Sequence, residues 1–237
     1  MSDFIETIRV ENDLVGPERT LRPSCLLNLL QQAAIHHTEQ LGMGREKTLD
    51  RGLLWAISRQ QIVIDRMPAY DERVVLTSWP GRTMHVLFPR YCELRTQEGE
   101  RLLRASALWV LLDAGTRSFV FPDEYGVELP GMDRADQLPL PEQPVSLPSA
   151  SETQFTVPYS YVDLNGHMNN TRYLDLAEDL LPEDARTRPL AEIRIAHQLE
   201  ARCGQTLTVS MGADETVRTF TGRLEKPVFQ LSLRYRS

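Results

Sequence analysis

The stretch Tyr161-Val162-Asp163-Leu164-Asn165-Gly166-His167-Met168-Asn169-Asn170 lies where a strand-like segment gives way to a helix-like one. Side chains of an extended segment alternate between two faces, so every second residue points the same way. We therefore expect Asp163, Asn165 and His167 to project towards one place. A carboxylate, a carboxamide and an imidazole can together orient a water molecule, polarise a carbonyl group and move a proton. This stretch is the candidate catalytic centre.

The same residues also fit a purely structural role. Asp163 and Asn165 are residue types that often form turns and cap helices. Gly166 is typical of a tight backbone, and His167 fits a histidine buried in a core. Taken one at a time, these structural interpretations are favoured, and only the combination of residues points to catalysis.

The elements around this stretch repeat an order found earlier in the chain. In the first copy a strand over residues 4–15 precedes a helix from Leu26 to Leu41, with Ser24 as its candidate N-cap. In the second copy a strand over 154–161 precedes a helix from Tyr173 to Leu181, capped by Asn169 or Asn170. Alternating segments predict strands at 54–58, 61–64, 74–79, 85–96, 102–113 and 118–121 in the first copy, and at 191–200, 207–211, 216–226 and 228–235 in the second.

One helix packed against an antiparallel sheet is an α+β unit, and the chain contains two of them. We place the units at residues 1–125 and 151–237, joined by a proline-rich linker over residues 126–150. Proline confines the backbone to extended shapes, so the linker is expected to act as a semi-rigid strap. Each unit is small for a core of its own, which favours packing of the two halves on each other.

Composition excludes several classes of protein. The 237 residues carry a formal net charge of -7, which argues against a general nucleic-acid binder. No apolar run is long enough to span a bilayer, and the first residues form no targeting segment, so we expect a cytoplasmic protein. Cys25, Cys92 and Cys203 are odd in number and far apart, which indicates neither a disulfide framework nor a zinc site.

Residues 162–174, Val-Asp-Leu-Asn-Gly-His-Met-Asn-Asn-Thr-Arg-Tyr-Leu, resemble the signature of the acyl-acyl carrier protein thioesterases, in their short bacterial form. The resemblance runs the length of the chain. It includes Gly16-Pro17 followed by Leu29-Leu30-Gln31-Gln32-Ala33, and the strand Ser106-Ala107-Leu108-Trp109-Val110. It implies a tandem hotdog fold, in which two helices are each wrapped by a sheet and the two sheets meet side by side. This agrees with the two-copy interpretation.

The resemblance also implies the members of the site. Asp163, Asn165 and His167 match the signature, and Glu200 matches a catalytic carboxylate that follows an alternating strand. His197 stands where the family usually has tyrosine. Ala201 stands where plant members have a cysteine once regarded as the nucleophile, so a cysteine mechanism is not available at that position.

The first half is expected to lack the catalytic residues. Met67 falls opposite Glu200, and the segment around Arg22-Pro23-Ser24-Cys25 offers no match to the signature. In this family the interior of the first half receives the acyl chain. The candidate substrate-binding residues are Met43, Leu53, Leu54, Trp55 and Ile57, each of which fits an ordinary core position equally well.

The implied activity is hydrolysis of a fatty acyl thioester on acyl carrier protein, with no metal or organic cofactor. In this hypothesis His167 and Glu200 hold and deprotonate a water molecule, Asp163 fixes the imidazole or shares in positioning, and Asn165 stabilises the oxyanion. The sequence leaves open which of His167 and Glu200 is the base, and whether Glu200 attacks directly. The alternatives are an acyl-CoA thioesterase of the same fold and a non-catalytic acyl-binding protein. A monomer would suffice, although exposed sheet edges could form a homodimer.

Overall fold

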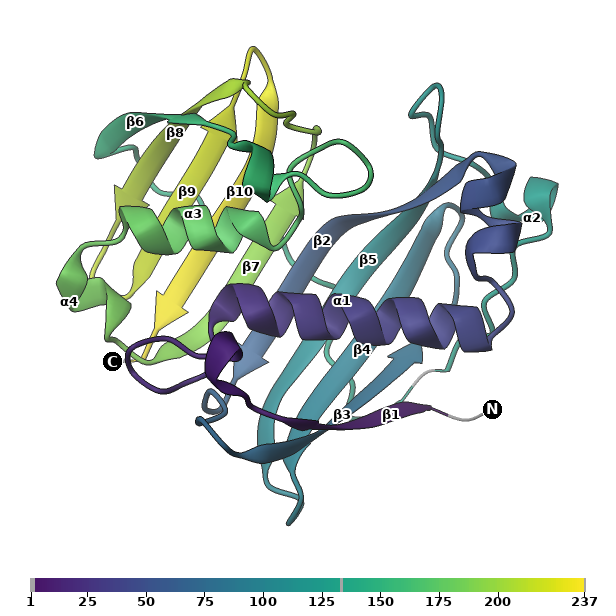
Figure 1. Cartoon of the computed structure of the whole chain (residues 1–237), viewed down its shortest axis with the longest axis horizontal. Coiled ribbons are helices and arrows are strands. Elements are labelled where there is room, and N and C mark those ends of the chain that lie inside the picture. Colours follow the sequence, from purple (N-terminus) through teal and green to yellow (C-terminus); the bar gives the residue numbers. More distant parts are fainter. Residues whose placement is uncertain (1–2, 133, 237) are drawn as a thin grey trace.

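The computed structural model describes residues 3–132 and 134–236. Within these residues ten strands form one antiparallel sheet, in the order β1-β3-β4-β5-β2-β7-β10-β9-β8-β6 (Figure 1). The strands of the first half are β1 Phe4–Arg9, β2 Leu53–Ile64, β3 Arg73–Pro80, β4 Leu87–Thr96 and β5 Arg101–Asp113; those of the second half are β6 Ser151–Thr156, β7 Leu190–His197, β8 Thr206–Ala213, β9 Val217–Arg223 and β10 Pro227–Tyr235.

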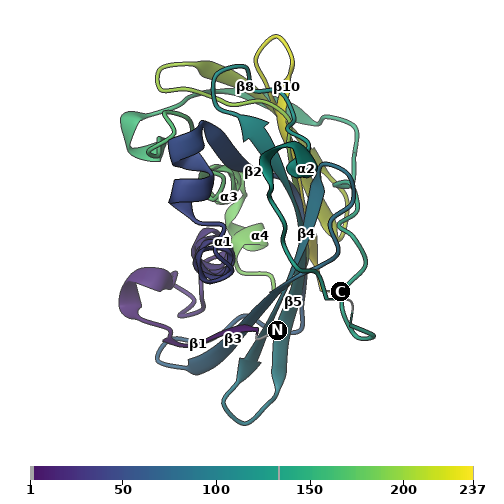
Figure 2. The ribbon, with the colours of Figure 1, turned by 90° about the vertical axis from the view of Figure 1, so that its right-hand side faces the viewer.

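The sheet consists of two halves with the same strand order, which meet where β2 pairs with β7. Read from each outer edge inwards, β1-β3-β4-β5-β2 corresponds to β6-β8-β9-β10-β7. The helices α1 (Pro23–Gln40) and α3 (Arg172–Leu180) lie on the same face of the sheet (Figures 1 and 2). The predicted α+β class and the predicted repeat are both confirmed.

The core is continuous across the two halves. On α1, buried residues recur every three or four positions and include Leu26, Leu30 and Ala33. On α3, Tyr173, Leu174 and Ala177 face the sheet in the same way. One cluster of buried side chains contains residues of both helices, of β2 and of β7. Two small α+β units therefore share the apolar interior that neither would build alone.

Several predicted elements differ in detail. The segments 54–58 and 61–64 form the single strand β2, whose register shifts between Ile57 and Arg59, so a bulge replaces the predicted break. Ser24 lies buried inside α1 rather than capping it, because the helix already begins at Pro23, a residue favoured in the first turn. Residues 118–121 form no strand and contribute one isolated bridge, between Leu112 and Phe119.

Two of these differences reshape the site. The strand predicted over 154–161 ends at Thr156, and Pro158 precedes a 3₁₀ turn over Tyr159–Tyr161. The strand predicted over 191–200 ends at His197, because from Gln198 the backbone leaves the ladder and two consecutive N–H groups donate to the single carbonyl of Val228. Glu200 therefore lies beyond the strand, on the segment that follows it.

Residues 126–150, which we call the strap, contain no helix or strand among those that the structure describes. The strap crosses the face of the sheet opposite α1 and α3 (Figure 2). The Glu142 N–H donates to Gln61 Oε1 at 3.0 Å on β2, and the Val145 N–H donates to the Ser232 hydroxyl at 3.1 Å on β10. It is thus hydrogen-bonded to strands of both halves. The residue bounds of the two units remain a prediction.

Within residues 3–132 and 134–236, no helix is both long enough and apolar enough to cross a membrane.

Candidate active site

The stretch from Tyr161 to Asn170 is a tight loop and not the extended segment that we predicted. The Asp163 N–H donates to the His167 carbonyl at 3.1 Å, and the Gly166 N–H donates to the Asp163 carbonyl at 3.0 Å. Gly166 adopts a φ of 79°, a left-handed conformation that glycine takes at little cost. Because the backbone reverses here, the side chains of Asp163, Asn165 and His167 do not form one row.

Asp163 stabilises this loop from within. Its Oδ1 accepts the backbone N–H of Asn165 at 2.8 Å, and its Oδ2 accepts the side-chain amide of Asn169 at 3.3 Å. Asn169 in turn accepts the N–H of Thr171 at 2.9 Å, just before α3 begins. Among the described residues, the Asp163 carboxylate makes no hydrogen bond or ion pair with the His167 imidazole. Its observed role is that of a turn residue, the structural alternative given above.

His167 and Glu200 lie together. His167 Nε2 is 3.4 Å from Glu200 Oε1, and the two side chains are 18% and 28% exposed. The backbone holds them in place, because the Met168 N–H donates to the Ala201 carbonyl at 2.7 Å, joining the residues that follow each of them. Met168 and Ala201 are both buried. A proton can therefore pass within a carboxylate–imidazole pair that has access to solvent.

Two arginines also lie near Glu200, and the sequence analysis predicted a contact with Glu200 for neither of them. Arg117 Nε lies 3.1 Å from Oε1, and Arg202 Nη2 lies 3.9 Å from Oε2. Arg202 is two residues from Glu200, a spacing that could have suggested the contact. Arg117 follows β5 of the first half, and nothing in its local sequence indicates that it reaches the second half.

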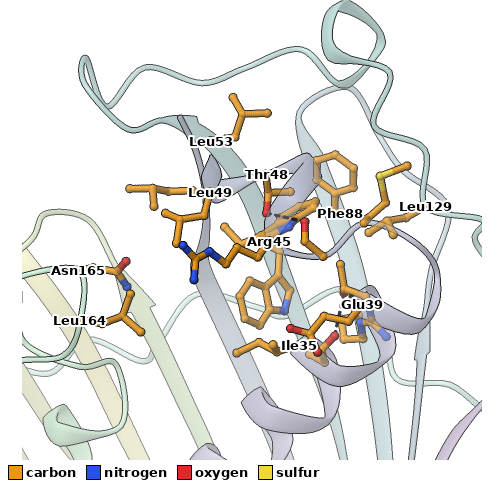
Figure 3. Close-up of a pocket in the computed structure, with 18 of the residues that line it drawn as sticks. Ile35, Glu39, Arg45, Thr48, Leu49, Leu53, Phe88, Leu129, Leu164 and Asn165 are labelled. Atoms are coloured by element: carbon orange, nitrogen blue, oxygen red, sulfur yellow. Dashed lines mark hydrogen bonds between the residues drawn. The ribbon is translucent and has the colours of Figure 1, made fainter. Parts of the chain in front are cut away.

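An apolar cavity of about 280 Å³ adjoins the loop (Figure 3). Its walls come from the C-terminal half of α1, the segment after it, and strands β2, β4 and β5, whereas Leu164 and Asn165 approach from the loop of the second half. Four of the five predicted substrate-binding residues line it, namely Met43, Leu53, Leu54 and Trp55. Ile57 is 3% exposed and lies outside the lining. The Asn165 side chain is exposed and has no hydrogen-bond partner among the described residues.

Arg90 closes part of the cavity wall with a buried guanidinium group. It donates to His37 Nδ1 at 2.8 Å and to the Thr38 hydroxyl at 2.9 Å, both on α1. Burial lowers the pKa of Arg90 to about 10, because the charged form loses hydration. Its position excludes a role in docking a partner at the surface.

Comparison with known proteins identifies the family. Residues 2–126 match the acyl-ACP thioesterase N-terminal domain, and residues 146–226 match the acyl-ACP thioesterase C-terminal domain. The chain belongs to the acyl-ACP thioesterase family.

One relative of this chain is a chloroplastic palmitoyl-acyl carrier protein thioesterase of Cuphea hookeriana, which is 24% identical over 85% of this chain and 52% of the relative. A chloroplastic dodecanoyl-[acyl-carrier-protein] hydrolase of Cinnamomum camphora is 26% identical over 90% of this chain and 61% of the relative. The chain therefore spans only about half to three fifths of the length of such curated relatives.

Solved structures share the whole fold. An acyl-ACP thioesterase from Bacteroides thetaiotaomicron superposes with a TM-score of 0.82 at 20% identity, covering 98% of this chain and 97% of that one. The 12:0-ACP thioesterase from Umbellularia californica gives a TM-score of 0.84 at 19% identity, covering 99% and 97%. The tandem hotdog fold implied by the family resemblance is confirmed.

The first half of this thioesterase-family chain contains a second copy of the loop. The Gly16 N–H donates to the Thr20 carbonyl at 3.0 Å, and the Arg19 N–H donates to the Gly16 carbonyl at 2.9 Å. These are the bonds made by Asp163, His167 and Gly166 in the second half. Arg19 even takes a left-handed φ of 57°, as Gly166 does. The counterpart of the motif is therefore Gly16–Thr20, and not the segment around Arg22–Cys25 that we predicted from the order of residues.

This copy retains the backbone but not the side chains. Gly16, Glu18 and Thr20 occupy the positions of Asp163, Asn165 and His167. Met67 lies as far beyond β2 as Glu200 lies beyond β7. The Leu21 N–H donates to the Pro68 carbonyl at 2.8 Å, which repeats the bond between Met168 and Ala201. The copy thus has neither an imidazole nor a carboxylate to pair with one.

We expect Gly166→Ala to destabilise the fold by about 1 kcal/mol, because a left-handed φ is unfavourable for alanine. No atom lies within 4 Å of the added Cβ, so the cost is confined to the backbone. Urea denaturation measures it. Arg19→Ala is the matched control, since the first-half loop already carries a side chain at this φ, and its effect should be close to zero. Equal effects of the two substitutions would contradict this account.

His197, the residue that departs from the family pattern, is half-buried, and its Nε2 is buried. Its ring lies 5.2 Å from that of Tyr173, and its Nε2 has no hydrogen-bond partner among the described residues. Burial, and secondly the neighbouring His167, lower the pKa of His197 to about 4. Burial likewise raises the pKa of Tyr173. Both groups stay neutral and pack as rings beneath the site.

The pKa of His197 makes folding sensitive to acid. The unfolded chain binds a proton at this imidazole below about pH 6.5, whereas the folded chain resists protonation down to about pH 4. Stability must therefore fall as the pH falls from about 6.5 towards 4. We expect wild type to lose about 1–2 kcal/mol more than His197→Phe between pH 7 and pH 5, measured by urea denaturation at both pH values. Parallel losses in the two proteins would contradict the prediction.

No group of three or more histidine, cysteine, aspartate or glutamate residues is placed to hold a metal ion within residues 3–132 and 134–236.

Proposed function

We propose that this protein hydrolyses the thioester of a fatty acyl group carried by acyl carrier protein. The observation that carries the proposal is the pairing of His167 with Glu200, where His167 belongs to the loop whose Leu164 and Asn165 line the apolar cavity, in a chain of the acyl-ACP thioesterase family. An acyl-CoA thioester is the alternative substrate, since the reacting group is the same. A non-catalytic acyl-binding protein would have no need for a carboxylate–imidazole pair of this kind.

In the proposed reaction the acyl chain occupies the cavity and the thioester carbonyl lies near Asn165. The His167–Glu200 pair accepts a proton from a bound water molecule while the water oxygen attacks the carbonyl carbon. The carbonyl oxygen becomes an oxyanion, to which the Asn165 side-chain amide donates a hydrogen bond. The carbon–sulfur bond then breaks, and the pair returns the proton to the departing sulfur. The products are a free fatty acid and the carrier thiol.

Asp163 contributes indirectly to this reaction. Its hydrogen bonds to the Asn165 N–H and the Asn169 amide stabilise the loop that presents Asn165 and His167. Removal of its carboxylate is expected to disturb both side chains together. This role corresponds to the second alternative given for Asp163, a share in positioning, and involves no contact between its carboxylate and the His167 imidazole among the described residues.

The test is thiol release by the purified protein from one acyl group supplied on two carriers. With acyl carrier protein we expect turnover at a kcat/KM of about 10⁴ M⁻¹s⁻¹ or more, and at least tenfold less with coenzyme A. Higher turnover of the coenzyme A thioester would favour the alternative substrate. Binding of acyl carrier protein without any thiol release from either carrier would overturn the proposal in favour of a binding protein.

A further inference from the structure

Arg117 is held in an ordered turn at the end of β5. Asp113 Oδ1 accepts the backbone N–H groups of Gly115 at 3.0 Å and Thr116 at 2.7 Å, as well as the Thr116 hydroxyl at 3.0 Å. The Arg117 N–H donates to the Asp113 carbonyl at 2.9 Å. Arg117 has a φ of 60°, a left-handed conformation that is unfavourable for a residue with a side chain. The hydrogen bonds of the turn stabilise this strained conformation.

The same turn adjoins the cavity. The Ala114 N–H donates to the Gly52 carbonyl at 2.7 Å, immediately before β2 and its cavity-lining residues Leu53 and Leu54. The turn that carries Arg117 is therefore attached to the wall of the cavity in the first half, while the side chain of Arg117 reaches Glu200 in the second half.

The contact with Glu200 differs from that of an ordinary surface ion pair. Arg117 Nε and His167 Nε2 lie 3.1 Å and 3.4 Å from the same oxygen, Oε1 of Glu200. The Arg117 side chain is 33% exposed, and its Nη1 is buried without a hydrogen-bond partner among the described residues. By contrast, Arg202 approaches the other oxygen at 3.9 Å and is 67% exposed.

We infer that Arg117 is a positioning residue of the reaction centre, which fixes the Glu200 carboxylate against His167, so that the two halves of the chain build the centre together. The inference rests on the proposed function. A guanidinium group is always charged in proteins and directs its N–H donors in a rigid plane. Shared contact at one oxygen sets the carboxylate orientation relative to the imidazole.

The inference explains two features that the fold alone leaves without a purpose. A left-handed arginine in a turn is a cost that a glycine would avoid. A buried guanidinium nitrogen without a hydrogen-bond partner is also unfavourable. Both are consistent with a side chain selected for its place in the centre, since strained residues of this kind cluster at functional sites.

The experiment compares steady-state hydrolysis of acyl-acyl carrier protein by wild type, Arg117→Ala, Arg117→Lys and Arg202→Ala. We expect Arg117→Ala to lower kcat about 10- to 100-fold with KM within about twofold, because positioning acts on the chemical step. Millimolar guanidinium should restore at least a tenth of the lost rate in Arg117→Ala and leave wild type unchanged, with urea at the same concentration as the control. The kcat of Arg117→Lys should fall between that of wild type and that of Arg117→Ala, since lysine retains the positive charge without the planar guanidinium group. Arg202→Ala should stay within twofold of wild type.

Each outcome decides the inference. Inactive wild type would remove the proposed function itself. Active wild type with an unchanged Arg117→Ala, or a raised KM at constant kcat, would overturn the positioning role alone. An equal loss of kcat in Arg202→Ala would show a general effect of positive charge near Glu200 and would also overturn the positioning role of Arg117. Thermal unfolding of each variant identifies misfolding. If Arg117→Ala does not fold, the test rests on Arg117→Lys. A folded Arg117→Lys variant with the same kcat as wild type would then overturn the positioning role of the guanidinium group.

Discussion

Replacing Glu200 by glutamine is expected to lower the rate of thioester hydrolysis about 10²- to 10⁴-fold, the range that a positioned acid–base group contributes. Glutamine keeps the shape of the side chain and loses its charge, so it can neither accept a proton from water nor pair with His167 and Arg117. The measurement is kcat and KM for thiol release from acyl carrier protein. The loss should appear in kcat, because the carboxylate acts after the substrate has bound.

The chain supplies its own matched control for this variant. Met67 lies at the corresponding place in the first half, beyond β2, and has no imidazole beside it. Met67→Gln introduces the same side chain into the counterpart position, and we expect turnover within about twofold of wild type. A Glu200→Gln enzyme that retains most of its activity would remove Glu200 from the mechanism and would leave His167 as the sole candidate base. Similar losses at both positions would indicate damage to the shared core.

Sequence periodicity was sufficient for the α+β class and for the order of most elements, because each element carries its own signal, whereas the tandem hotdog fold was implied by the family resemblance. Buried residues of α1 and α3 recur at helical spacing, and the strands of both halves alternate or form apolar runs. The duplication also follows from the order of elements. The position of the duplicated loop does not, because Gly16–Thr20 and Asp163–His167 share a hydrogen-bonding pattern and scarcely any side chains. Only the backbone shows that they are equivalent.

The residues of the candidate site could be proposed from the sequence, whereas their arrangement in space could not. The motif and Glu200 were proposed from the resemblance, but Asp163, Asn165 and His167 were expected on an extended segment, and the structure has a tight loop there. Residues two positions apart in the sequence point the same way in an extended segment and different ways in a tight turn. The spacing alone therefore does not distinguish the two conformations. The turn is favoured here because Gly166 takes a left-handed φ and the Asp163 carboxylate accepts the N–H of Asn165.

Arg117 was beyond the reach of the sequence for a different reason. Its contact joins a turn after β5 to a segment after β7, and the pairing of β2 with β7 is what brings the two halves together. Local patterns identify turns and caps, whereas a contact between halves depends on how the sheets join. The same limit applies to the cavity, where Ile57 satisfies the pattern of its neighbours and yet lies outside the lining.

The cavity should set the acyl chain length, and substitutions in its wall should shift that preference in opposite directions. Ala34 lies on α1 and Leu54 on β2, and both line the cavity of about 280 Å³. Ala34→Phe removes space, so the longest acyl chains should lose affinity by about 0.8 kcal/mol for each methylene that no longer fits, roughly fourfold in kcat/KM. Leu54→Ala adds space and should favour longer chains. The measurement is kcat/KM across a series of saturated acyl groups on acyl carrier protein.

The series provides its own control, because the shortest acyl groups should not reach the altered wall. Their kcat/KM should stay within about twofold of wild type in both variants, whereas a general loss of packing would lower every chain length alike. A phenylalanine in a filled core would cost about 1–3 kcal/mol of stability, while one that enters an existing cavity should cost less, which thermal unfolding can check. If both variants shifted the preference in the same direction, or in neither, the acyl chain would have to lie elsewhere. The proposed roles of Met43, Leu53, Leu54 and Trp55 would then fall together, while the roles of His167 and Glu200 would be untouched.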